Sequence, residues 1–288
     1  MTAQLVAVLG RGVLETDEPF VHADDLGLTR GDGCFDATLV FAGEAPRRVL
    51  HLDRHIARLE RSAAGLELQG PPADDWRALV EEALAHPLAP PQESMLKLVL
   101  ARGREEHPSG VLAYLTVTPM PDSTAASRRG IDVASLDRGV ASDSFAQSPW
   151  LLGGVKTISY AVNLAAKREA DRRGADDALF VSTDGYALEA PTAALIVRRG
   201  DELVTTPVGA TGVLASITVA TLYEAAQGEE IECWHRLLPL AEVFDGDGAW
   251  LVSSVRGIAP IRHLDGRELA FDEGWHERLT RLAGFADA

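Results

Sequence analysis

One stretch of this 288-residue chain decides the fold: Gly153-Gly154-Val155-Lys156-Thr157-Ile158-Ser159-Tyr160-Ala161-Val162-Asn163. A short apolar run, Trp150 to Leu152, precedes it, and the two glycines allow the backbone to pass close to other groups. A helix is expected over residues 160–173, because Gly174 is a stop signal and arginines occupy the last turns. Lys156 therefore lies between an apolar run and a helix.

A lysine in this setting is a candidate for imine formation. Desolvation lowers the pKa of an amine and leaves its lone pair available for attack on a carbonyl carbon. The alternative is a lysine at the end of a strand, with its ammonium group in solvent. Both interpretations stay open on these residues alone.

Composition narrows the class of protein. With 46 % apolar residues the chain can bury one large core or two medium ones. The net charge is −16 and no run of Lys and Arg forms a basic patch, which argues against nucleic-acid binding. Cys34 and Cys233 are far apart and predict neither a disulfide framework nor a metal site. No apolar run reaches the length of a membrane span and residues 1–10 do not resemble a signal peptide, so a cytoplasmic protein is expected.

Two domains are expected. Residues 119–130 have the composition of a linker, with prolines, serines and a closing glycine. The prediction is an N-terminal domain over residues 1–118 and a larger domain over residues 131–288. Both halves mix strand and helix patterns, so the fold class is mixed α/β (α+β).

Further candidate residues lie on either side of this linker. Arg58 flanks an apolar helical stripe, where it could bind a phosphate or only extend along the surface. Glu189 follows an apolar run, and a glycine-punctuated loop at residues 206–216 leads into a helix whose N-terminus could bind an anion. An amine, an acid, an arginine and such a helix start are together what pyridoxal phosphate requires.

These residues carry a resemblance to a known family. The chain resembles the class-IV aminotransferases, the fold-type-IV family of pyridoxal-phosphate enzymes. Six motifs occur in the order of that family: Gly31-Asp32-Gly33-Cys34-Phe35-Asp36, His55-Ile56-Ala57-Arg58-Leu59-Glu60-Arg61-Ser62, Val155-Lys156-Thr157-Ile158-Ser159-Tyr160, Asp184-Gly185-Tyr186-Ala187-Leu188-Glu189-Ala190-Pro191-Thr192, Gly212-Val213-Leu214-Ala215-Ser216-Ile217-Thr218, and Ser253-Ser254 with Gly257-Ile258-Ala259-Pro260.

The resemblance implies a role for each matched residue. Lys156 would be the catalytic lysine that forms the Schiff base with the cofactor. The residues implied to contact the cofactor are Arg58, Lys156, Tyr160, Glu189, Ile217, Thr218 and Ser254. Glu189 would face the pyridine nitrogen, whereas Arg58, Ile217, Thr218 and Ser254 would hold the phosphate. Tyr160 matches less closely, because the local spacing differs from that of the branched-chain enzymes. The family has a small and a large domain with the cofactor at their junction, and it works as a homodimer.

The substrate side is less closely matched. The residues expected to border it are Arg30, Phe35, Arg102, Arg104 and His107. The Arg-x-His pair that holds the substrate carboxylate in the best-known D-amino acid aminotransferases is absent here. Arg30, the form of the lysine motif and the Arg-Gly-Ala-Asp-Asp run at residues 173–177 nevertheless resemble actinobacterial proteins that act on D-amino acids or as lyases.

The resemblance implies a transaminase that moves an amino group between small-molecule D-amino acids and 2-oxo acids. The first alternative is aminodeoxychorismate lyase, which forms 4-aminobenzoate and pyruvate in the folate pathway. Further alternatives are a branched-chain L-amino acid aminotransferase, an (R)-amine transaminase, and a non-catalytic protein that only binds the cofactor. No metal, nucleic acid or membrane partner is expected.

Overall fold

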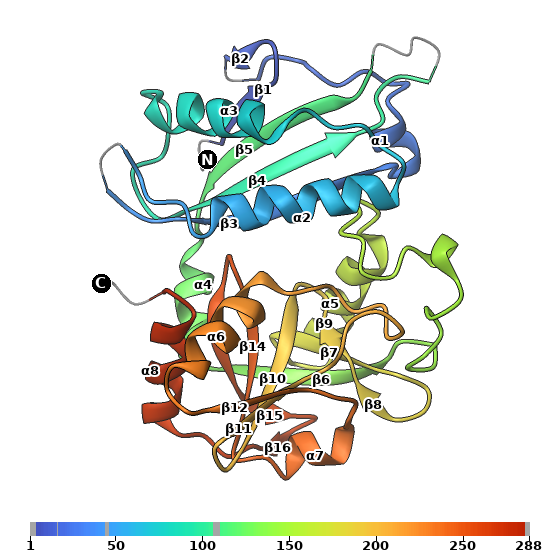
Figure 1. Ribbon diagram of the computed structural model, residues 1–288, viewed down its shortest axis with the longest axis vertical. Coiled ribbons are helices and arrows are strands. Elements are labelled where there is room, and N and C mark those ends of the chain that lie inside the picture. The colour runs from blue at the N-terminus through green and yellow to red at the C-terminus, as the bar shows by residue number, and fades with distance from the viewer. Residues whose placement is uncertain (1–3, 16, 44–45, 106–109, 286–288) are drawn as a thin grey trace. The chain divides into compact units, whose positions relative to one another are not determined.

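The computed structural model describes residues 4–15, 17–43, 46–105 and 110–285 (Figure 1). The chain divides into two compact units. Unit 1 comprises Met1–Pro121 and Val155–Tyr160, and unit 2 comprises Asp122–Gly154 and Ala161–Ala288.

Unit 1 is built on a five-stranded antiparallel sheet in the order β2-β1-β5-β4-β3. Its strands are β1 (Leu5–Val8), β2 (Gly12–Val13), β3 (Gly33–Val40), β4 (Ser94–Ala101) and β5 (Leu112–Pro119). Its helices are α1 (Leu26–Arg30), α2 (Leu52–Gly65) and α3 (Ala73–Ala85). Strand β3 is at one edge of this sheet, so one side of its backbone is available for another segment.

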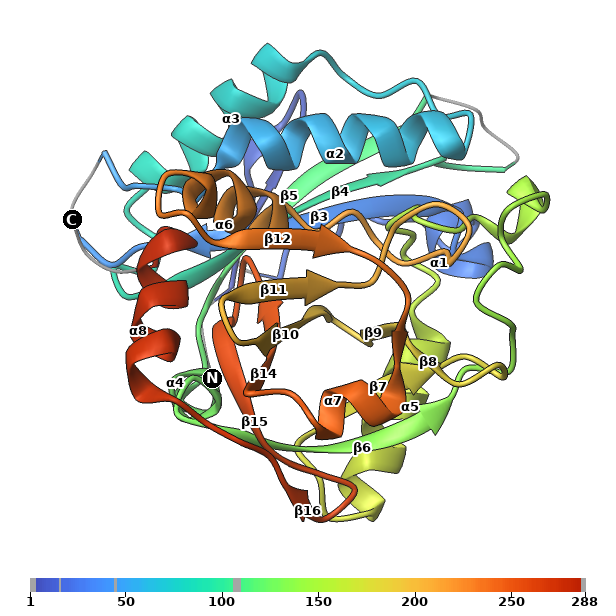
Figure 2. The same ribbon diagram turned by 60° about the horizontal axis from the view of Figure 1, so that its bottom comes forward.

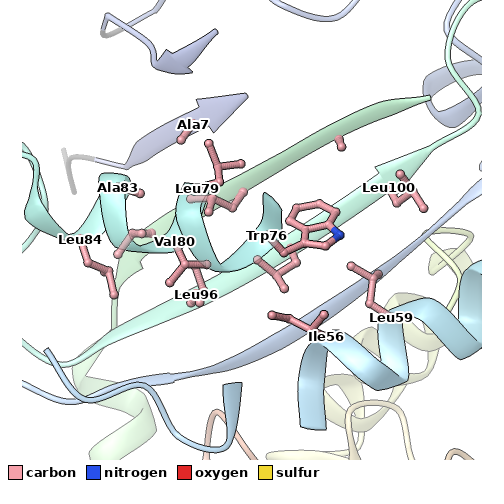
Figure 3. Close-up of a cluster of buried hydrophobic side chains, with 14 of the residues drawn as sticks. Ala7, Ile56, Leu59, Trp76, Leu79, Val80, Ala83, Leu84, Leu96 and Leu100 are labelled. Atoms are coloured by element: carbon pink, nitrogen blue, oxygen red, sulfur yellow. The ribbon is translucent and has the colours of Figure 1, made fainter. Parts of the chain in front are cut away.

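The core of unit 1 lies between one face of this sheet and the helices α2 and α3 (Figure 3). Ile56 and Leu59, three positions apart on α2, point toward the strands, as the helical spacing of the apolar residues requires. Trp76 of α3 is 1 % exposed and packs in the same cluster. Fully burying an Ile or Leu side chain stabilises a fold by about 1.5–3 kcal/mol. This packing fixes α2 against the sheet.

Unit 2 contains a larger mixed sheet in the order β12-β11-β10-β14-β15-β6-β7-β8-β13, with β9 paired to β10 and β16 paired to β15. The strands curve around a common interior (Figure 2). The strands are β6 (Ile131–Asp137), β7 (Asp177–Val181), β8 (Tyr186–Ala187), β9 (Glu189–Ala190), β10 (Ala193–Arg199), β11 (Glu202–Thr205), β12 (Glu232–His235), β13 (Leu238–Pro239), β14 (Gly248–Ser253), β15 (Gly257–Leu264) and β16 (Arg267–Glu268). The helices are α4 (Asp122–Ser127), the 3-10 turn η1 (Pro149–Leu151), α5 (Ala161–Arg172), α6 (Ile217–Gln227), α7 (Leu240–Phe244) and α8 (Glu273–Leu282).

Among its described residues, unit 2 is held together by three apolar clusters. One fills the interior of the curved sheet and includes Leu195, Leu251 and Ile261. A second joins α6 and α8 to β10 and β14 through residues such as Leu222 and Trp250. A third packs α5 on β6 and β7. Because α6 is packed along its length, its N-terminus has a fixed position in this unit.

The predicted division of the chain differs from these units in two details. The expected linker at residues 119–130 contains helix α4, which Asp122 in its first turn favours through the helix dipole. Residues Val155–Tyr160, predicted to belong with the C-terminal domain, are part of unit 1. The expected helix after Lys156 is present as α5, which ends shortly before Gly174 with its φ of 75°. Within the described residues, no helix has the length and apolar character needed to cross a membrane.

Candidate functional site

The segment that carries Lys156 runs along the free edge of β3. The backbone N–H of Phe35 donates to the carbonyl of Lys156 at 3.0 Å, and the N–H of Ile158 donates to the carbonyl of Gly33 at 2.9 Å. The N–H of Lys156 donates to the hydroxyl of Ser62 on α2 at 3.2 Å. The main chain at Lys156 is therefore bonded on both sides, to a strand and to a helix.

The glycine loop before β3 makes this pairing possible. Gly31 has a φ of 68° and ends α1 in the left-handed conformation. A Cβ atom on Gly31 would collide with the hydroxyl of Ser159. A Cβ atom on Gly33 would lie 2.6 Å from the carbonyl oxygen of Leu100. Larger residues at either position would separate the Lys156 segment or β4 from β3.

The side chain of Lys156 lies against two aromatic rings. Its Nζ atom is 4.5 Å from the ring centroid of Phe35 and 5.7 Å from that of Tyr160. The two rings meet edge to face, with centroids 5.2 Å apart. Lys97 of β4 approaches the Phe35 ring as well, also at 4.5 Å, and burial lowers the pKa of Lys97. Phe35, predicted to border the substrate, is thus a neighbour of the predicted catalytic amine.

Arg58 projects from α2 onto a buried carboxylate, that of Asp36 on β3. The guanidinium donates two hydrogen bonds to Asp36, Nε to Oδ2 at 2.7 Å and Nη2 to Oδ1 at 2.8 Å. His55, also on α2, lies 2.7 Å from Oδ1 through Nδ1, and the N–H of Ala37 donates to the same oxygen at 2.8 Å. The two-point contact fixes the plane of the guanidinium.

The charge state of this cluster follows from its contacts. Burial alone raises the pKa of Asp36, but the hydrogen bonds from Arg58 and His55 outweigh it and lower that pKa well below its usual range. Burial lowers the pKa of His55 against the opposing effect of Asp36. Since an ionised Asp36 can only accept, a neutral His55 places its proton on Nδ1.

Sequence reasoning assigned no role to Asp36. The signal that could have found it is the strand alternation, which places Asp36 on the face of β3 opposite Phe35. That face packs on α2, so an acid there needs a cation from the helix. Arg58 supplies that cation, and Ser62, four residues further on the same helix face, receives the N–H of Lys156.

In unit 2, Glu189 lies on the short strand β9, where it pairs with Ala194 of β10. Its Oε2 atom accepts a hydrogen bond of 3.1 Å from the N–H of Leu214. A cavity of about 180 Å³ in unit 2 is bordered by Glu189, Leu214 and Ser216. The predicted acid and the loop that leads into α6 therefore line the same space.

The N-terminus of α6 carries the predicted phosphate contacts. Ser216 caps the helix by accepting the N–H of Val219 at 3.2 Å, and Ile217 and Thr218 are the first helical residues. The hydroxyl of Thr218 lies 3.1 Å from that of Ser254, in the turn between β14 and β15. Thr218 and Ser254, 36 residues apart, thus present two adjacent hydroxyls beside a helix N-terminus, where an anion is stabilised.

Phe145 packs against two glycines, Gly153 before Lys156 and Gly212 in the loop that leads into α6. A Cβ atom on Gly153 would lie 2.6 Å from the Phe145 ring, and one on Gly212 would lie 2.5 Å from it. The N–H of Gly154 donates to the carbonyl of Gly212 at 2.9 Å. Sequence reasoning expected a close backbone approach at these glycines and missed Phe145, which has no motif of its own. Phe145 holds the loop that supplies the N–H of Leu214.

Two of the arginines predicted to border the substrate are paired with acids. Arg102 pairs with Asp32 at 2.6 Å and also donates to the carbonyl of Leu66 at 2.7 Å. Arg104 pairs with Asp24 at 2.9 Å and lowers the pKa of that carboxyl. Arg30 is exposed at the end of α1. His107 lies outside the described residues.

Comparisons with known proteins agree with these motifs. Residues 33–264 match the family model described as amino-transferase class IV. A relative from Mycobacterium tuberculosis (strain ATCC 25618 / H37Rv), named bifunctional aminodeoxychorismate lyase / D-amino acid transaminase, is 38 % identical over 92 % of this chain and 93 % of its own length. An aminodeoxychorismate lyase from Vibrio harveyi is 26 % identical over 92 % of this chain and 94 % of its own.

Solved structures show the same likeness. A hypothetical aminotransferase from Mycobacterium tuberculosis, in its PLP-bound form, superposes with a TM-score of 0.91 at 37 % identity over 97 % of both chains. A fold IV-transaminase from Curtobacterium pusillum superposes with a TM-score of 0.88 at 36 % identity over 98 % of this chain and 99 % of its own. These likenesses confirm the predicted fold class. The chain therefore belongs to the class-IV aminotransferases, enzymes that use pyridoxal 5'-phosphate (PLP).

Proposed function

We propose that this enzyme transfers amino groups between D-amino acids and 2-oxo acids. The held position of Lys156 supports the PLP chemistry of this proposal, and the D-amino acid substrate class rests on the relative from Mycobacterium tuberculosis, whose name includes that activity. Its main chain is bonded to β3 and α2, and its amine lies against the rings of Phe35 and Tyr160. A solvated lysine at a strand end would lack the contacts of its amine with the two rings.

The residues of unit 1 fit two parts of PLP. When bound, PLP supplies an aldehyde carbon and a protonated ring that withdraws electrons from the substrate α-carbon. Lys156 is the amine that we propose to hold the aldehyde and to move the proton at the α-carbon. Arg58 is proposed to bind the phosphate, with Asp36 fixing the orientation of its guanidinium. Tyr160 is proposed to contact the cofactor ring.

The residues of unit 2 fit the remaining parts. Glu189 is proposed to keep the ring nitrogen protonated, because the N–H of Leu214 stabilises the ionised carboxylate. The first amides of α6, at Ile217 and Thr218, are proposed to donate to the phosphate. The hydroxyls of Thr218 and Ser254 lie together and are proposed to complete the phosphate contacts.

On the substrate side we propose Arg30, Phe35, Arg102, Arg104 and His107. Among the arginines, Arg30 is the strongest candidate for the substrate carboxylate, because Arg102 and Arg104 already pair with Asp32 and Asp24. Release of either of these arginines toward a substrate would leave a carboxylate without its cation. Phe35 supplies an apolar wall beside the Lys156 amine.

Aminodeoxychorismate lyase activity is the second candidate. The relative that is 38 % identical carries both activities in its name. Both reactions need an amine that removes a proton and an acid that keeps the cofactor ring protonated, so the proposed roles of Lys156 and Glu189 apply to either. The reactions would differ in whether the proton is then delivered to the cofactor or pyruvate leaves the substrate.

Single-turnover absorbance measurements test this proposal. The PLP-loaded enzyme is mixed separately with D-alanine, D-glutamate, L-leucine and (R)-phenylethylamine, and a lyase assay is run beside them. D-alanine and D-glutamate are expected to convert the PLP form of the enzyme, whereas L-leucine is not. Conversion by L-leucine alone would contradict the proposed substrate class, and product from the lyase assay alone would establish the second candidate.

We also propose that the enzyme is a homodimer, as the resemblance implies. Four large apolar side chains of unit 2 are exposed within residues 150–164: Trp150 at 73 %, Leu151 at 47 %, Val162 at 54 % and Leu164 at 49 %. Such a density of exposed apolar side chains is typical of protein interfaces. Light scattering during size-exclusion chromatography checks the mass, and replacing Trp150 and Leu164 with Ser is expected to shift it toward the monomer.

A further inference from the structure

Two hairpin turns lie at the same end of the large sheet in unit 2. On β10, Ala194 pairs with Glu189 of β9 on one side and with Val252 of β14 on the other. The turn after β9 consists of Pro191 and Thr192, and the turn after β14 consists of Ser254, Val255 and Arg256. One turn therefore follows the proposed ring-nitrogen acid, and the other carries a proposed phosphate ligand.

Arg256 connects these two turns through its side chain. Its Nη2 atom donates to the carboxylate of Asp177, and it lies 3.3 Å from the hydroxyl of Thr192. Asp177 is 1 % exposed and begins β7. The N–H of Ala178 and the ammonium of Lys167, at 2.9 and 3.5 Å, complete the contacts of this carboxylate. The side chain of Arg256 thus joins its own turn to a buried acid and to the turn that contains Thr192.

The backbone of the Ser254 turn is held as well. Arg128 donates through Nε to the carbonyl of Arg256 at 2.7 Å, and the N–H of Arg256 donates to the hydroxyl of Ser253 at 3.2 Å. Gly257 ends the turn with a φ of 88°, a left-handed conformation that favours glycine. With the side chain of Arg256 fixed on Asp177, the turn is restrained at its backbone and at its side chain.

We infer that Arg256 is a positioning residue that holds the Ser254 hydroxyl beside Thr218 for binding of the cofactor phosphate. This inference rests on the proposed function of Ser254. Arg256 acts through the turn, since its guanidinium is already engaged by Asp177 and Thr192. Its loss is expected to affect the phosphate contact specifically, because Glu189 remains held by β10 and by the N–H of Leu214.

A matched control separates positioning from general stability. The side chain of Arg198 is 15 % exposed, against 14 % for Arg256, and it lies at the other end of the same β10–β14 pair. Arg198 is 3.7 Å from Asp272. Arg198→Gln therefore removes an equally buried guanidinium from the same sheet without touching the Ser254 turn.

The experiment compares two ligands on the apoenzyme, PLP and pyridoxal, which lacks the phosphate. Dissociation constants are measured by absorbance titration for wild type, Ser254→Ala, Arg256→Gln, Arg256→Lys, the Ser254→Ala/Arg256→Gln double variant and Arg198→Gln. Melting temperatures of the apoenzymes are recorded beside them. Arg256→Lys keeps a cation beside Asp177, so this variant can still test the inference if Arg256→Gln does not fold.

Arg256→Gln is expected to weaken PLP binding by about tenfold or more, the size of one hydrogen bond to a charged group, while changing pyridoxal binding by much less. The double variant is expected to bind PLP about as weakly as the single variant with the lower affinity, because both changes remove the same contact. Arg256→Lys is expected to fall between wild type and Arg256→Gln in its affinity for PLP.

Two results would overturn the inference, each in a distinguishable way. If Ser254→Ala weakens PLP selectively and both Arg256 variants behave like Arg198→Gln, Arg256 is only structural and the proposed function stands. If wild type binds PLP no better than pyridoxal, the proposed phosphate site itself is wrong, and the inference fails with it.

Discussion

Glu189 accepts a hydrogen bond of 3.1 Å from the backbone N–H of Leu214, which lies 25 residues further along the chain. The donor is a main-chain group, and its loop is held by the packing of Gly212 on Phe145. The orientation of the carboxylate therefore depends on the fold of this loop. An N–H donor also favours the ionised form of the acid.

This relationship predicts the behaviour of Glu189→Gln. The amide oxygen of Gln can still accept the N–H of Leu214, so cofactor retention is expected to be largely kept. A neutral side chain cannot keep the ring nitrogen protonated, so substrate turnover is expected to slow severely. Single-turnover absorbance measures both effects, and loss of the cofactor with normal turnover of the remaining holoenzyme would contradict this role.

Lys156 is predicted to be the residue that holds the cofactor covalently. The chain has three lysines, Lys97, Lys156 and Lys167, so the assignment can be decided by peptide mapping. Borohydride reduction of the PLP-loaded enzyme is expected to leave the label on the peptide that contains Lys156. Lys156→Ala is expected to abolish turnover while PLP remains bound through its phosphate. Lys97 lies at the same Phe35 ring, and a label on Lys97 would contradict the assignment of Lys156.

Arg58→Ala is predicted to weaken cofactor retention by about 1.5–3 kcal/mol, the contribution of one hydrogen bond to a charged group. The change also leaves Asp36 buried without its two-point partner, so the melting temperature is expected to fall as well. Arg61→Ala is the control, because Arg61 is on the same helix and is exposed. Normal PLP affinity of Arg58→Ala, measured by titration at a temperature where it is folded, would show that Arg58 serves only Asp36.

Arg30→Ala is predicted to raise KM for D-alanine and for 2-oxo acids while sparing (R)-phenylethylamine, which has no carboxylate. The contact is made in the ground state and the transition state alike, so the loss is expected mainly in binding. Arg102→Ala and Arg104→Ala are expected to lower the melting temperature by breaking the pairs with Asp32 and Asp24. Equal losses for both amino donors in all three variants would show that these arginines are structural.

The buried pair of Asp36 and Arg58 predicts a loss of stability in acid. The pKa of Asp36 is lowered in the folded state, whereas it is about 3.9 in an unfolded chain. Between these two values the unfolded state binds more protons, so stability falls as the pH falls. The contribution of Asp36 is fully present above about pH 4 and is lost as the pH drops through the lowered pKa.

Urea unfolding as a function of pH checks this prediction. Asp36→Asn is expected to be less stable than wild type at pH 7, with the difference shrinking below about pH 4. Asp53→Asn is a suitable control, since Asp53 pairs with Arg77 on the surface of unit 1. A difference between wild type and Asp36→Asn that does not change with pH would mean that Asp36 acts by packing and not by charge.

The sequence by itself determined the family, the helix that carries Arg58 and the helix that follows Lys156. Apolar residues at helical spacing around Arg58 predicted α2, because that pattern leaves one face to bury. Gly31 begins the first of the six motifs and adopts a left-handed conformation that other residues avoid. The six motifs and their order predicted a class-IV aminotransferase, which the family match and the relatives confirm.

The tertiary structure alone decided which distant residues became partners. It paired the Lys156 segment with β3 and placed Asp36 between Arg58 and His55. It also paired Arg102 with Asp32 and Arg104 with Asp24. It also brought the N–H of Leu214 to Glu189 and the guanidinium of Arg256 to Asp177. The spacing of residues in the sequence indicates which residues are neighbours within one helix or strand. Each of these contacts instead joins residues that are far apart in the chain, and only the packing of whole elements brings such residues within hydrogen-bonding distance.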